Sequence, residues 1–432
     1  MQSAMLFAGF IEILKKEVVP ATGCTEPVSV ALAAAQCRQL LGKLPDSLNV
    51  RVSPNLLKNG LGVTVPPTGK KGLPIAAAVG AVGGNAEAGL QVLADITPEQ
   101  VSQAEQMISD GKIIIQQAPV SNTVYVRATA KAGTDEAVVT IADKHTHIIE
   151  RSLNGTHYLT EPENDKNSPT PSAPFDISQS SAREIYDFSL TAPLNSIEFM
   201  GFTATLNASL AQEGLKNEYG LQIGKILTED LKQGLLSDDL LTRAMRITAA
   251  ASDARMGGAT LAAASNSGSG NQGITATIPV VITAQWIKAS HEQLIRALTL
   301  SHLTAIYIKS HLPSLSAMCA TTTAAMGSAV SITWLLGGDF SASERAVHNI
   351  IGDVSGMICD GAKNGCAMKV STSTQAAIKA VLIAISGSRV TGQEGIIQPN
   401  VEDSIRNLGS IVHQGMKTVD TQILKIMTQK MV

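Results

Sequence analysis

The sequence predicts an α+β protein, in which a large, mostly helical domain carries a cysteine site and a smaller α+β domain contains a mixed sheet. Two patterns support this fold class. Between residues 112 and 152, short segments alternate or run apolar as strands do. After residue 181 the apolar residues recur almost entirely at helical spacing. Between these patterns, residues 161–180 hold four prolines among Asn, Asp and Ser, which indicates a loop or domain boundary.

The same patterns predict how the chain is divided. We expect N-terminal helices over residues 1–43 that pack on the helical domain, followed by a small α+β domain over residues 44–160. The boundary loop then covers residues 161–180, and the helical domain with the cysteine site covers residues 181–432.

The N-terminal region predicts two helices. Apolar residues from Leu6 to Val18 recur at helical spacing, and Pro20 stops this helix. A second helix is expected from about Thr25 to Leu41, because Pro27 is tolerated in a first turn and glycine and proline follow the helix.

The small domain is expected to contain several strands and two helical segments. Thr97 is a good N-cap for the second helix. The expected strands are 48–52, 62–65, 112–116, 123–129, 136–141 and 147–152, and the expected helical segments are 75–93 (in part) and 98–109.

The second half of the chain is expected to be helical. The clearest helices are 197–214, 221–233, 238–254, 293–309 and 372–385. Residues 256–287 and 312–338 contain no charged side chain, which raises the question of a membrane span. Both stretches are rich in hydroxyl, amide or glycine residues, so we expect them to be buried in a protein that does not cross a membrane. Their polar side chains then need partners, such as those of an active-site cavity.

Composition narrows the class of protein further. The net charge is −3 and there is no long basic run, which argues against a nucleic acid as the main partner. Five cysteines, an odd number, without a secretory signal indicate a reduced, cytoplasmic protein. Helical faces rich in alanine and glycine favour a homodimer.

Four of the five cysteines lie in polar, glycine-rich or threonine-rich surroundings, unlike Cys37. Cys359 and Cys366 flank a six-residue loop with two glycines, and Cys319 precedes a threonine run. Three thiolates on a four-iron cluster leave one iron with an open position, which can act as a Lewis acid. The alternative is a set of scattered thiols without a metal.

Cys24 is expected at or just before a helix N-terminus, where the helix dipole and free amides lower a thiol pKa. Its thiolate could act as a nucleophile, as a base or as a fourth cluster ligand. The alternative interpretation is a capping turn with no chemical role.

Two loops are candidates for substrate binding. Residues 265–273 can form a backbone nest for a carboxylate or a phosphate, unless they are a flexible linker. The side chains that could add hydrogen bonds there are Asn266, Ser267, Ser269, Asn271 and Gln272. In a second loop, Lys58 and Asn59 could face a substrate, although turn chemistry alone explains the neighbouring glycines and prolines.

A combination of motifs in this chain resembles the L-cysteine desulfidase family. The motifs are the segments 21–27, 58–60 and 267–273 and the trio Cys319, Cys359 and Cys366. That family is related to the iron–sulfur L-serine dehydratases through their alpha-chain domain, and the resemblance covers nearly the whole chain. It implies a [4Fe-4S] cluster on the three late cysteines and a β-elimination without pyridoxal phosphate. The implied reaction converts L-cysteine, a small amino-acid substrate, to hydrogen sulfide, ammonia and pyruvate, with Cys24 as base or displaceable fourth ligand.

Three other functions stay open from the sequence. One is an L-serine dehydratase of the same fold, although such enzymes generally carry histidine where this chain has Cys24. Another is a pyridoxal-phosphate lyase with Lys363 or Lys369 as the Schiff-base lysine. The third is a non-catalytic homologue that binds a small molecule or a metal.

Overall fold

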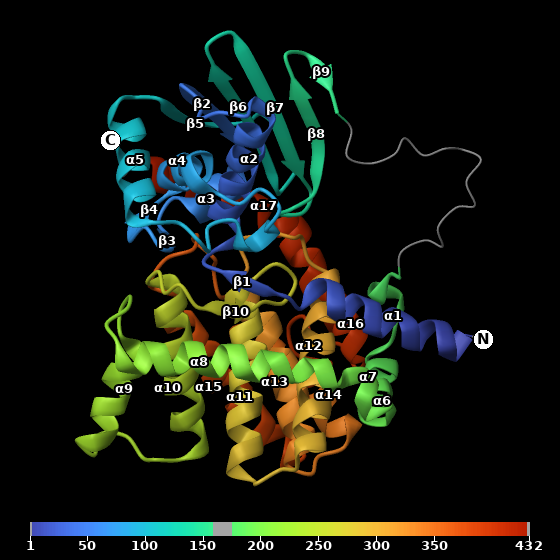
Figure 1. Ribbon diagram of the computed structural model, residues 1–432. Coiled ribbons are helices and arrows are strands. Elements are labelled where there is room, and N and C mark those ends of the chain that lie inside the picture. Colours follow the sequence, from blue (N-terminus) through green and yellow to red (C-terminus); the bar gives the residue numbers. More distant parts are fainter. Residues whose placement is uncertain (1, 159–174, 430–432) are drawn as a thin grey trace.

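The chain folds into a sheet-containing part and a helical part, which lie one above the other in Figure 1. The computed structural model describes residues 2–158 and 175–429. The expected α+β class, with a large helical part and a smaller part built on a mixed sheet, is confirmed. Most of the expected boundary loop lies outside the described residues.

The main sheet has six strands in the order β5-β2-β6-β7-β8-β9. The β2–β5 pair is parallel and the other neighbours are antiparallel, so the sheet is mixed as expected. The strands are β2 (Ser47–Val52), β5 (Ile113–Gln117), β6 (Tyr125–Ala132), β7 (Asp135–Ala142), β8 (Ile148–Leu153) and β9 (Thr156–His157).

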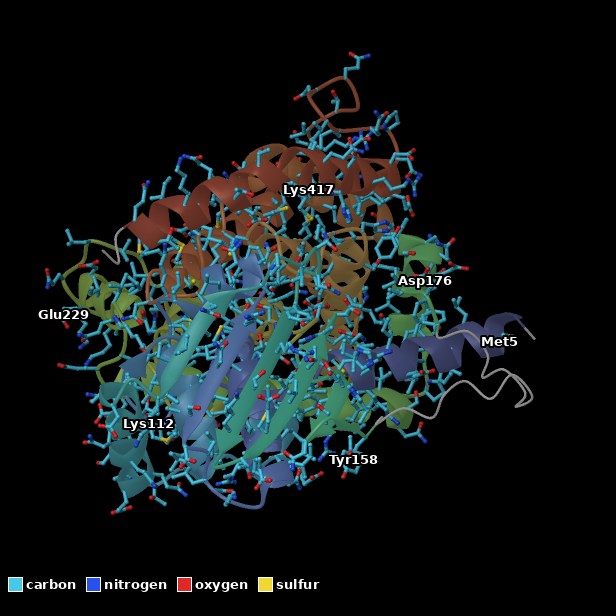
Figure 2. All side chains as sticks on the ribbon, turned by 90° about the horizontal axis from the view of Figure 1, so that it is seen from above. Met5, Lys112, Tyr158, Asp176, Glu229 and Lys417 are labelled. Atoms are coloured by element: carbon cyan, nitrogen blue, oxygen red, sulfur yellow. The ribbon has the colours of Figure 1, made fainter. Side chains whose placement is uncertain are left out.

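Helices cover one face of this sheet. Alternate residues of β2 (Leu48, Val50 and Val52) are buried, as expected for a strand with one covered face. Figure 2 looks onto the sheet from above, with Lys112 near its β5 edge and Tyr158 near its β9 edge. The helices of this part are α2 (Thr25–Leu41), α3 (Pro54–Gly60), α4 (Leu73–Gly83), η1 (Gly89–Gln91) and α5 (Pro98–Ser109), where Thr97 forms the expected cap.

The helical part has its own hydrophobic core. The two charge-free stretches form helices α11 and α13, which are buried along most of their length. The elements here are α1 (Gln2–Glu17), η2 (Ile177–Gln179), α6 (Ala182–Thr191), α7 (Leu194–Ile197), η3 (Glu198–Met200), α8 (Gly201–Lys216), α9 (Ile223–Lys232), α10 (Leu240–Met256), α11 (Gly270–Trp286), α12 (His291–Ser310), α13 (Ala320–Leu335), α14 (Phe340–Val354), α15 (Cys366–Ile385), α16 (Val401–Ser410) and η4 (Ile411–Gly415).

Two features connect the two parts. Strand β1 (Pro20–Thr22) pairs with β10 (Ala262–Ala264) of the helical part, whereas the other short ribbon, β3 (Thr64–Val65) with β4 (Lys70–Lys71), lies within the sheet part. The last helix, α17 (Lys417–Gln429), contacts α3 of the sheet part. The N-terminal helices divide between the two cores: α1 packs with the helical core and α2 with the sheet core, whereas the sequence led us to expect both on the helical domain.

Within residues 2–158 and 175–429, no helix combines the length and the apolar character needed to cross a membrane.

Candidate active site

A cavity of about 100 Å³ lies where the two parts meet. A single water needs about 10–15 Å³ of such space, so the cavity has room for a small molecule. All four cysteines that the sequence singled out line it, namely Cys24, Cys319, Cys359 and Cys366. Cys37 lies in the sheet core instead.

Local pairing brings Cys24 to the 265–273 loop. Strand β1 ends at Thr22, and β10 leads into that loop, so the β1–β10 ribbon sets the two segments side by side. Thr25 Oγ1 donates a hydrogen bond of 2.9 Å to the carbonyl of Gly268. The starts of α2 and α11, which are far apart in the sequence, therefore face the same cavity.

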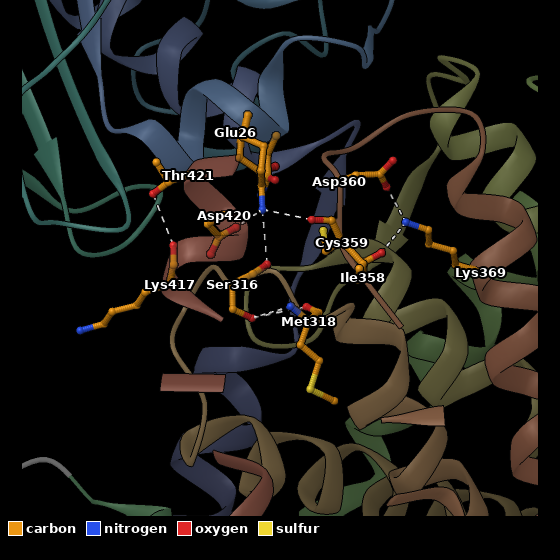
Figure 3. Close-up of polar contacts among 12 residues, drawn as sticks. Glu26, Ser316, Met318, Ile358, Cys359, Asp360, Lys369, Lys417, Asp420 and Thr421 are labelled. Atoms are coloured by element: carbon orange, nitrogen blue, oxygen red, sulfur yellow. Dashed lines mark hydrogen bonds and ion pairs between the residues drawn. The ribbon is translucent and has the colours of Figure 1, made fainter. Parts of the chain in front are cut away.

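Two of the late cysteines, Cys319 and Cys359, come together through a short backbone pairing. Met318 and Ile358 form an antiparallel bridge, so the cysteines that follow each of them are neighbours. The bridge is completed by bonds from the Cys319 amide to Met357 and from the Cys359 amide to Ala317. Figure 3 shows Met318, Ile358 and Cys359 around this point.

Three of the four thiols sit at the start of a helix. Cys24 and Cys319 precede the first residues of α2 and α13, and Cys366 is the first residue of α15. The amides of a first helical turn have no partner within the helix and carry a partial positive charge. The cavity is therefore surrounded by groups that stabilise negative charge, including the start of α11 at Ser269.

The donor set fits an iron–sulfur cluster. Burial raises the pKa of Cys366 to about 12, and the neighbouring Cys319 and Cys359 add to this rise. Burial and Cys359 likewise raise the pKa of Cys319. A positive centre beside Cys319 and Cys366 would favour their thiolates, and iron–sulfur clusters are held by cysteine thiolates.

Among the side chains that the structure describes, no group of three or more His, Cys, Asp or Glu is arranged to hold a single metal ion. This geometry does not conflict with a cluster, because a cluster spreads its thiolates over separate irons rather than gathering them at one point.

The environment of Cys24 differs from the expectation. Its thiol donates a 2.7 Å hydrogen bond to Glu26 Oε2. Burial, followed by the negative charge of Glu26, raises the pKa of the Cys24 thiol well above its ordinary value. The prediction of a lowered thiol pKa was therefore wrong, because burial and a carboxylate outweigh the helix N-terminus. Burial alone would raise the pKa of Glu26 too, but His145 and the hydrogen bonds from Cys24 and Asn59 leave it lowered.

The 265–273 loop supplies only some of the expected side chains. Ser267, Ser269 and Asn271 line the cavity. Asn266 and Gln272 are fully buried behind the loop, where Gln272 Nε2 donates to Asn266 Oδ1 at 2.7 Å, so the prediction that they bind substrate is not supported.

The loop backbone also differs from a simple nest. The amides of Ser267 and Ser269 already donate to the carbonyls of Glu17 and Asn266. In the first turn of α11 the Gln272 amide donates to Ser269 Oγ, which leaves the amides of Gly270 and Asn271 for an anion.

Lys58 does not line the cavity, contrary to the prediction. Its side chain is 1% exposed and its ammonium pairs with Asp420 of α17 at 2.5 Å. It also donates to the carbonyls of Ser316 and Cys359. Figure 3 shows Asp420, Ser316 and Cys359 gathered at this point. Lys58 therefore ties residues 359–366, called the cysteine loop below, and the last helix to α3, whereas Asn59 does reach the cavity.

Four charged or titratable side chains of the cavity were not identified from the sequence: Glu26, His145, Arg255 and Lys309. Burial lowers the pKa of Lys309 to about 8, an effect that Cys359 and Cys319 oppose. Within the described residues, three buried polar atoms of the cavity wall have no hydrogen-bond partner: Asn59 Oδ1, His145 Nε2 and Arg255 Nε. Such unpaired atoms are rare in folded proteins and indicate the place of a ligand or ordered water.

The two lysines considered for a Schiff base point elsewhere. Lys363 and Lys369 both pair with Asp360, and Lys369 also donates to the Ile358 carbonyl at 2.5 Å (Figure 3). Neither is part of the cavity lining. The geometry therefore does not favour the pyridoxal-phosphate alternative.

Comparison with known proteins adds an independent line of evidence. A model of the family described as "Serine dehydratase alpha chain" matches residues 87–425. A "UPF0597 protein" of Chromobacterium violaceum is 53% identical over 98% of both chains. A similarly named protein of Photobacterium profundum is 52% identical over 98% of this chain and 99% of its own. Another from Dichelobacter nodosus is 50% identical over 96% of each.

Proposed function

This chain belongs to the serine dehydratase alpha chain family, and from that premise we propose that it is an iron–sulfur lyase that acts on L-cysteine. The proposed reaction is a β-elimination without pyridoxal phosphate that yields hydrogen sulfide, ammonia and pyruvate. The observation that carries the proposal is the convergence of Cys24, Cys319, Cys359 and Cys366 on one cavity between the two parts of the molecule.

Cys319, Cys359 and Cys366 would hold a [4Fe-4S] cluster, with one iron left without a protein thiolate. When bound, the cluster supplies a Lewis acid for the departing sulfur of the substrate. The protein contributes the buried surroundings, because Cys319 is almost inaccessible to solvent and Cys359 and Cys366 are only partly exposed.

Cys24 is the residue we assign to removal of the Cα proton. It lines the same cavity as the trio, at the start of α2, and its thiol is held by Glu26. Because that carboxylate disfavours the thiolate, a cationic group bound beside it would lower the thiol pKa and prepare Cys24 to act as a base. Elimination gives aminoacrylate, which hydrolyses to pyruvate and ammonia without further help from the protein.

The second candidate is L-serine dehydration, which the description of the matching family favours. The two are separated by giving the anaerobic protein L-cysteine or L-serine and measuring pyruvate and sulfide. A larger kcat/KM for L-cysteine, with sulfide and pyruvate in equal amounts, supports the desulfidase. A larger kcat/KM for L-serine would reassign the substrate while keeping the lyase.

The cluster is tested by purifying the protein anaerobically and measuring its absorption near 400 nm with iron and sulfide assays. We expect broad absorbance and about four irons per chain, the content of such a cluster. A colourless protein that cannot be reconstituted with iron and sulfide would overturn the proposed mechanism. Binding of amino acids without turnover would then favour the non-catalytic homologue.

Cysteine substitutions separate the two roles. Cys359→Ala should remove the cluster and the activity together. Cys24→Ala should keep most of the iron while turnover falls by a factor of about 100 or more, as expected for loss of a general base. Cys37→Ala is the matched control, because Cys37 is buried in the sheet core, and it should change neither. Normal turnover in Cys24→Ala would show that the base is another group.

A further inference from the structure

Two buried side chains of opposite charge line the cavity without satisfying each other. Arg255 is 4% exposed and Glu26 is 6% exposed. Arg255 donates to the carbonyl of Gly23 and to the sulfur of Met256, neither of which is acidic. A buried charge is costly unless it is paired. Among the described basic side chains, Glu26 has only His145 beside it, and burial lowers the pKa of that imidazole, so both Arg255 and Glu26 leave a place for a counter-charge from a ligand.

The Arg255 side of the cavity suits a carboxylate. A Cβ atom at Gly270, the first residue of α11, would lie 2.2 Å from Arg255 Nε, so only glycine lets the guanidinium lie against this helix start. Arg255 Nε has no partner within the described chain. A guanidinium beside the free amides of a first helical turn combines the two protein groups that bind carboxylates most strongly.

The Glu26 side suits an ammonium group. Glu26 Oε1 accepts one hydrogen bond, from Asn59 Nδ2 at 2.8 Å. Glu26 Oε2 accepts from the Cys24 thiol, while the Thr25 hydroxyl, whose hydrogen goes to the Gly268 carbonyl, lies 3.3 Å from it. Since a carboxylate has about four acceptor positions, room remains for another donor. Asn59 Oδ1, on the amide that already contacts Glu26, is a second acceptor with no partner among the described residues.

We propose that these two ends form a zwitterion clamp. In it, Arg255 and the first turn of α11 bind the α-carboxylate of an amino acid, while Glu26 and Asn59 bind its α-ammonium. The clamp rests on the proposed function for its ligand class, and it adds the residues that select α-amino acids over simple acids and amines. Cys24 lies between the two ends, because it contacts Glu26 and follows Gly23, which contacts Arg255. A clamped amino acid therefore presents its Cα to Cys24.

The test uses three probes that have no leaving group, so the anaerobic holoenzyme cannot turn them over. L-2-Aminobutyrate carries both charges, butanoate lacks the ammonium and 1-propylamine lacks the carboxylate. Their dissociation constants are measured by titration calorimetry. L-2-Aminobutyrate should bind more tightly than either probe with a single charge.

Two substitutions should then separate the ends. Arg255→Met should weaken the binding of L-2-aminobutyrate and of butanoate by about 10- to 100-fold, which corresponds to the loss of hydrogen bonds to a charged group. The affinity for 1-propylamine should not change. Glu26→Gln should weaken the binding of L-2-aminobutyrate and of 1-propylamine and leave the affinity for butanoate unchanged. Arg246→Met, on the same helix α10 but outside the cavity lining, is the matched control and should alter no affinity.

Three outcomes would overturn the clamp. They are failure of all three probes to bind the wild-type protein, equal affinity for L-2-aminobutyrate and butanoate, and equal losses for every probe in both variants. If Arg255→Met does not fold, Arg255→Lys replaces it in the test. This change keeps the charge but loses the bidentate contact with a carboxylate. The affinity for butanoate should therefore fall, and the affinity for 1-propylamine should not. Because the probes need no elimination step, a protein without lyase activity can still pass this test, and an active lyase can fail it.

Discussion

The contact between Cys24 and Glu26 decides the state of the thiol that the proposed reaction needs. The dipole at a helix start is worth about 0.3–1 kcal/mol, less than the 1.36 kcal/mol that corresponds to one pKa unit. Burial of an ionisable group can shift its pKa by up to 3–5 units. Burial and the adjacent carboxylate therefore dominate, and Cys24 is held as a thiol until another positive charge arrives.

Replacing that carboxylate should make Cys24 more reactive. Glu26→Gln removes a negative charge that raises the thiol pKa, so the pKa should fall and the thiolate fraction should rise. At a pH below the pKa, the thiolate fraction rises tenfold for each unit by which the pKa falls. The rate of alkylation by iodoacetamide rises less steeply, by about three- to fourfold for each unit, because a thiolate of lower pKa is a weaker nucleophile. Peptide mapping by mass spectrometry between pH 7 and 9, on cluster-free protein, measures this rate for residue 24.

Cys37 is the internal control for that experiment. It is buried in the sheet core, and burial raises its pKa to about 12, so its alkylation should be slow and equal in both proteins. An unchanged or slower reaction at Cys24 in Glu26→Gln would contradict the assigned effect of the carboxylate.

At the level of elements, the cysteine loop depends on helices that carry no cysteine of the cavity. Gly361 has a φ of +91°, and a Cβ there would lie 2.5 Å from the carbonyl oxygen of Lys58 on α3. The loop also bonds to α3 through the amide of Ala362 and the carbonyl of Asn59. On the far side, Asp420 of α17 pairs with Lys58. The loop is thus held between the third helix of the chain and the last.

This arrangement predicts a large stability effect from a residue far from the chemistry. Asp420→Ala leaves the ammonium of Lys58 buried without its counter-charge, which typically costs 3–5 kcal/mol. Since Asp420 is 18% exposed, water offsets part of this and we expect about 2–3 kcal/mol. Lys58→Met combined with Asp420→Ala should cost less than the sum of the two single changes, because their effects are coupled.

Urea unfolding of the single and double variants measures these free energies. Lys232→Met is a matched control, since Lys232 and Glu229 form an exposed pair on α9, and it should change stability by no more than about 0.5 kcal/mol. Strict additivity of Lys58→Met and Asp420→Ala would show that the pair does not act as a unit.

At the scale of the whole molecule, the cavity lies where two separate hydrophobic cores meet. A small third cluster, with Cys24, Val63 and Met256 at its centre, joins them at that point. The wall contains residues from Cys24 to Cys366. Substitutions at this junction should therefore affect the cavity more than substitutions of the same kind inside either hydrophobic core.

Much of this organisation could be predicted from the sequence. The fold class and most helices and strands follow from apolar periodicity, and the meeting of four cysteines follows from their polar surroundings and the family resemblance. The pairing of β1 with β10 could not be predicted, because strands of three residues are too short to show alternation. Helices α11 and α13 were expected only as buried segments, since they are apolar all round and show no amphipathic period.

The sequence was least informative about single polar residues. Lys58 lies beside Asn59 in the chain, yet one is buried under the cysteine loop and the other faces the cavity. Glu26 and Arg255 belong to no motif with a fixed spacing. Their role depends on which residues pack around each of them, and that information is present only in the folded structure.

The expected homodimer can be tested on the surface of α15. Large apolar side chains of this helix are exposed, namely Met368, Leu382, Ile383 and Ile385. If two copies pack through this face, Leu382→Glu should halve the mass measured by light scattering after size-exclusion chromatography. Ile226→Glu, at an exposed position on α9, should leave the mass unchanged. A monomeric wild-type protein would contradict the dimer.

The pairing of Lys58 with Asp420 also sets an order on biosynthesis. Asp420 follows all four cysteines of the cavity in the chain, so the cysteine loop cannot be locked until residue 420 has been synthesised. At synthesis rates of about 5–20 residues per second, roughly 20–80 s pass between synthesis of Cys24 and of Asp420. During that interval Cys24 has no wall around it and is open to oxidants. The cluster that we propose would therefore be assembled after residue 420 has been made.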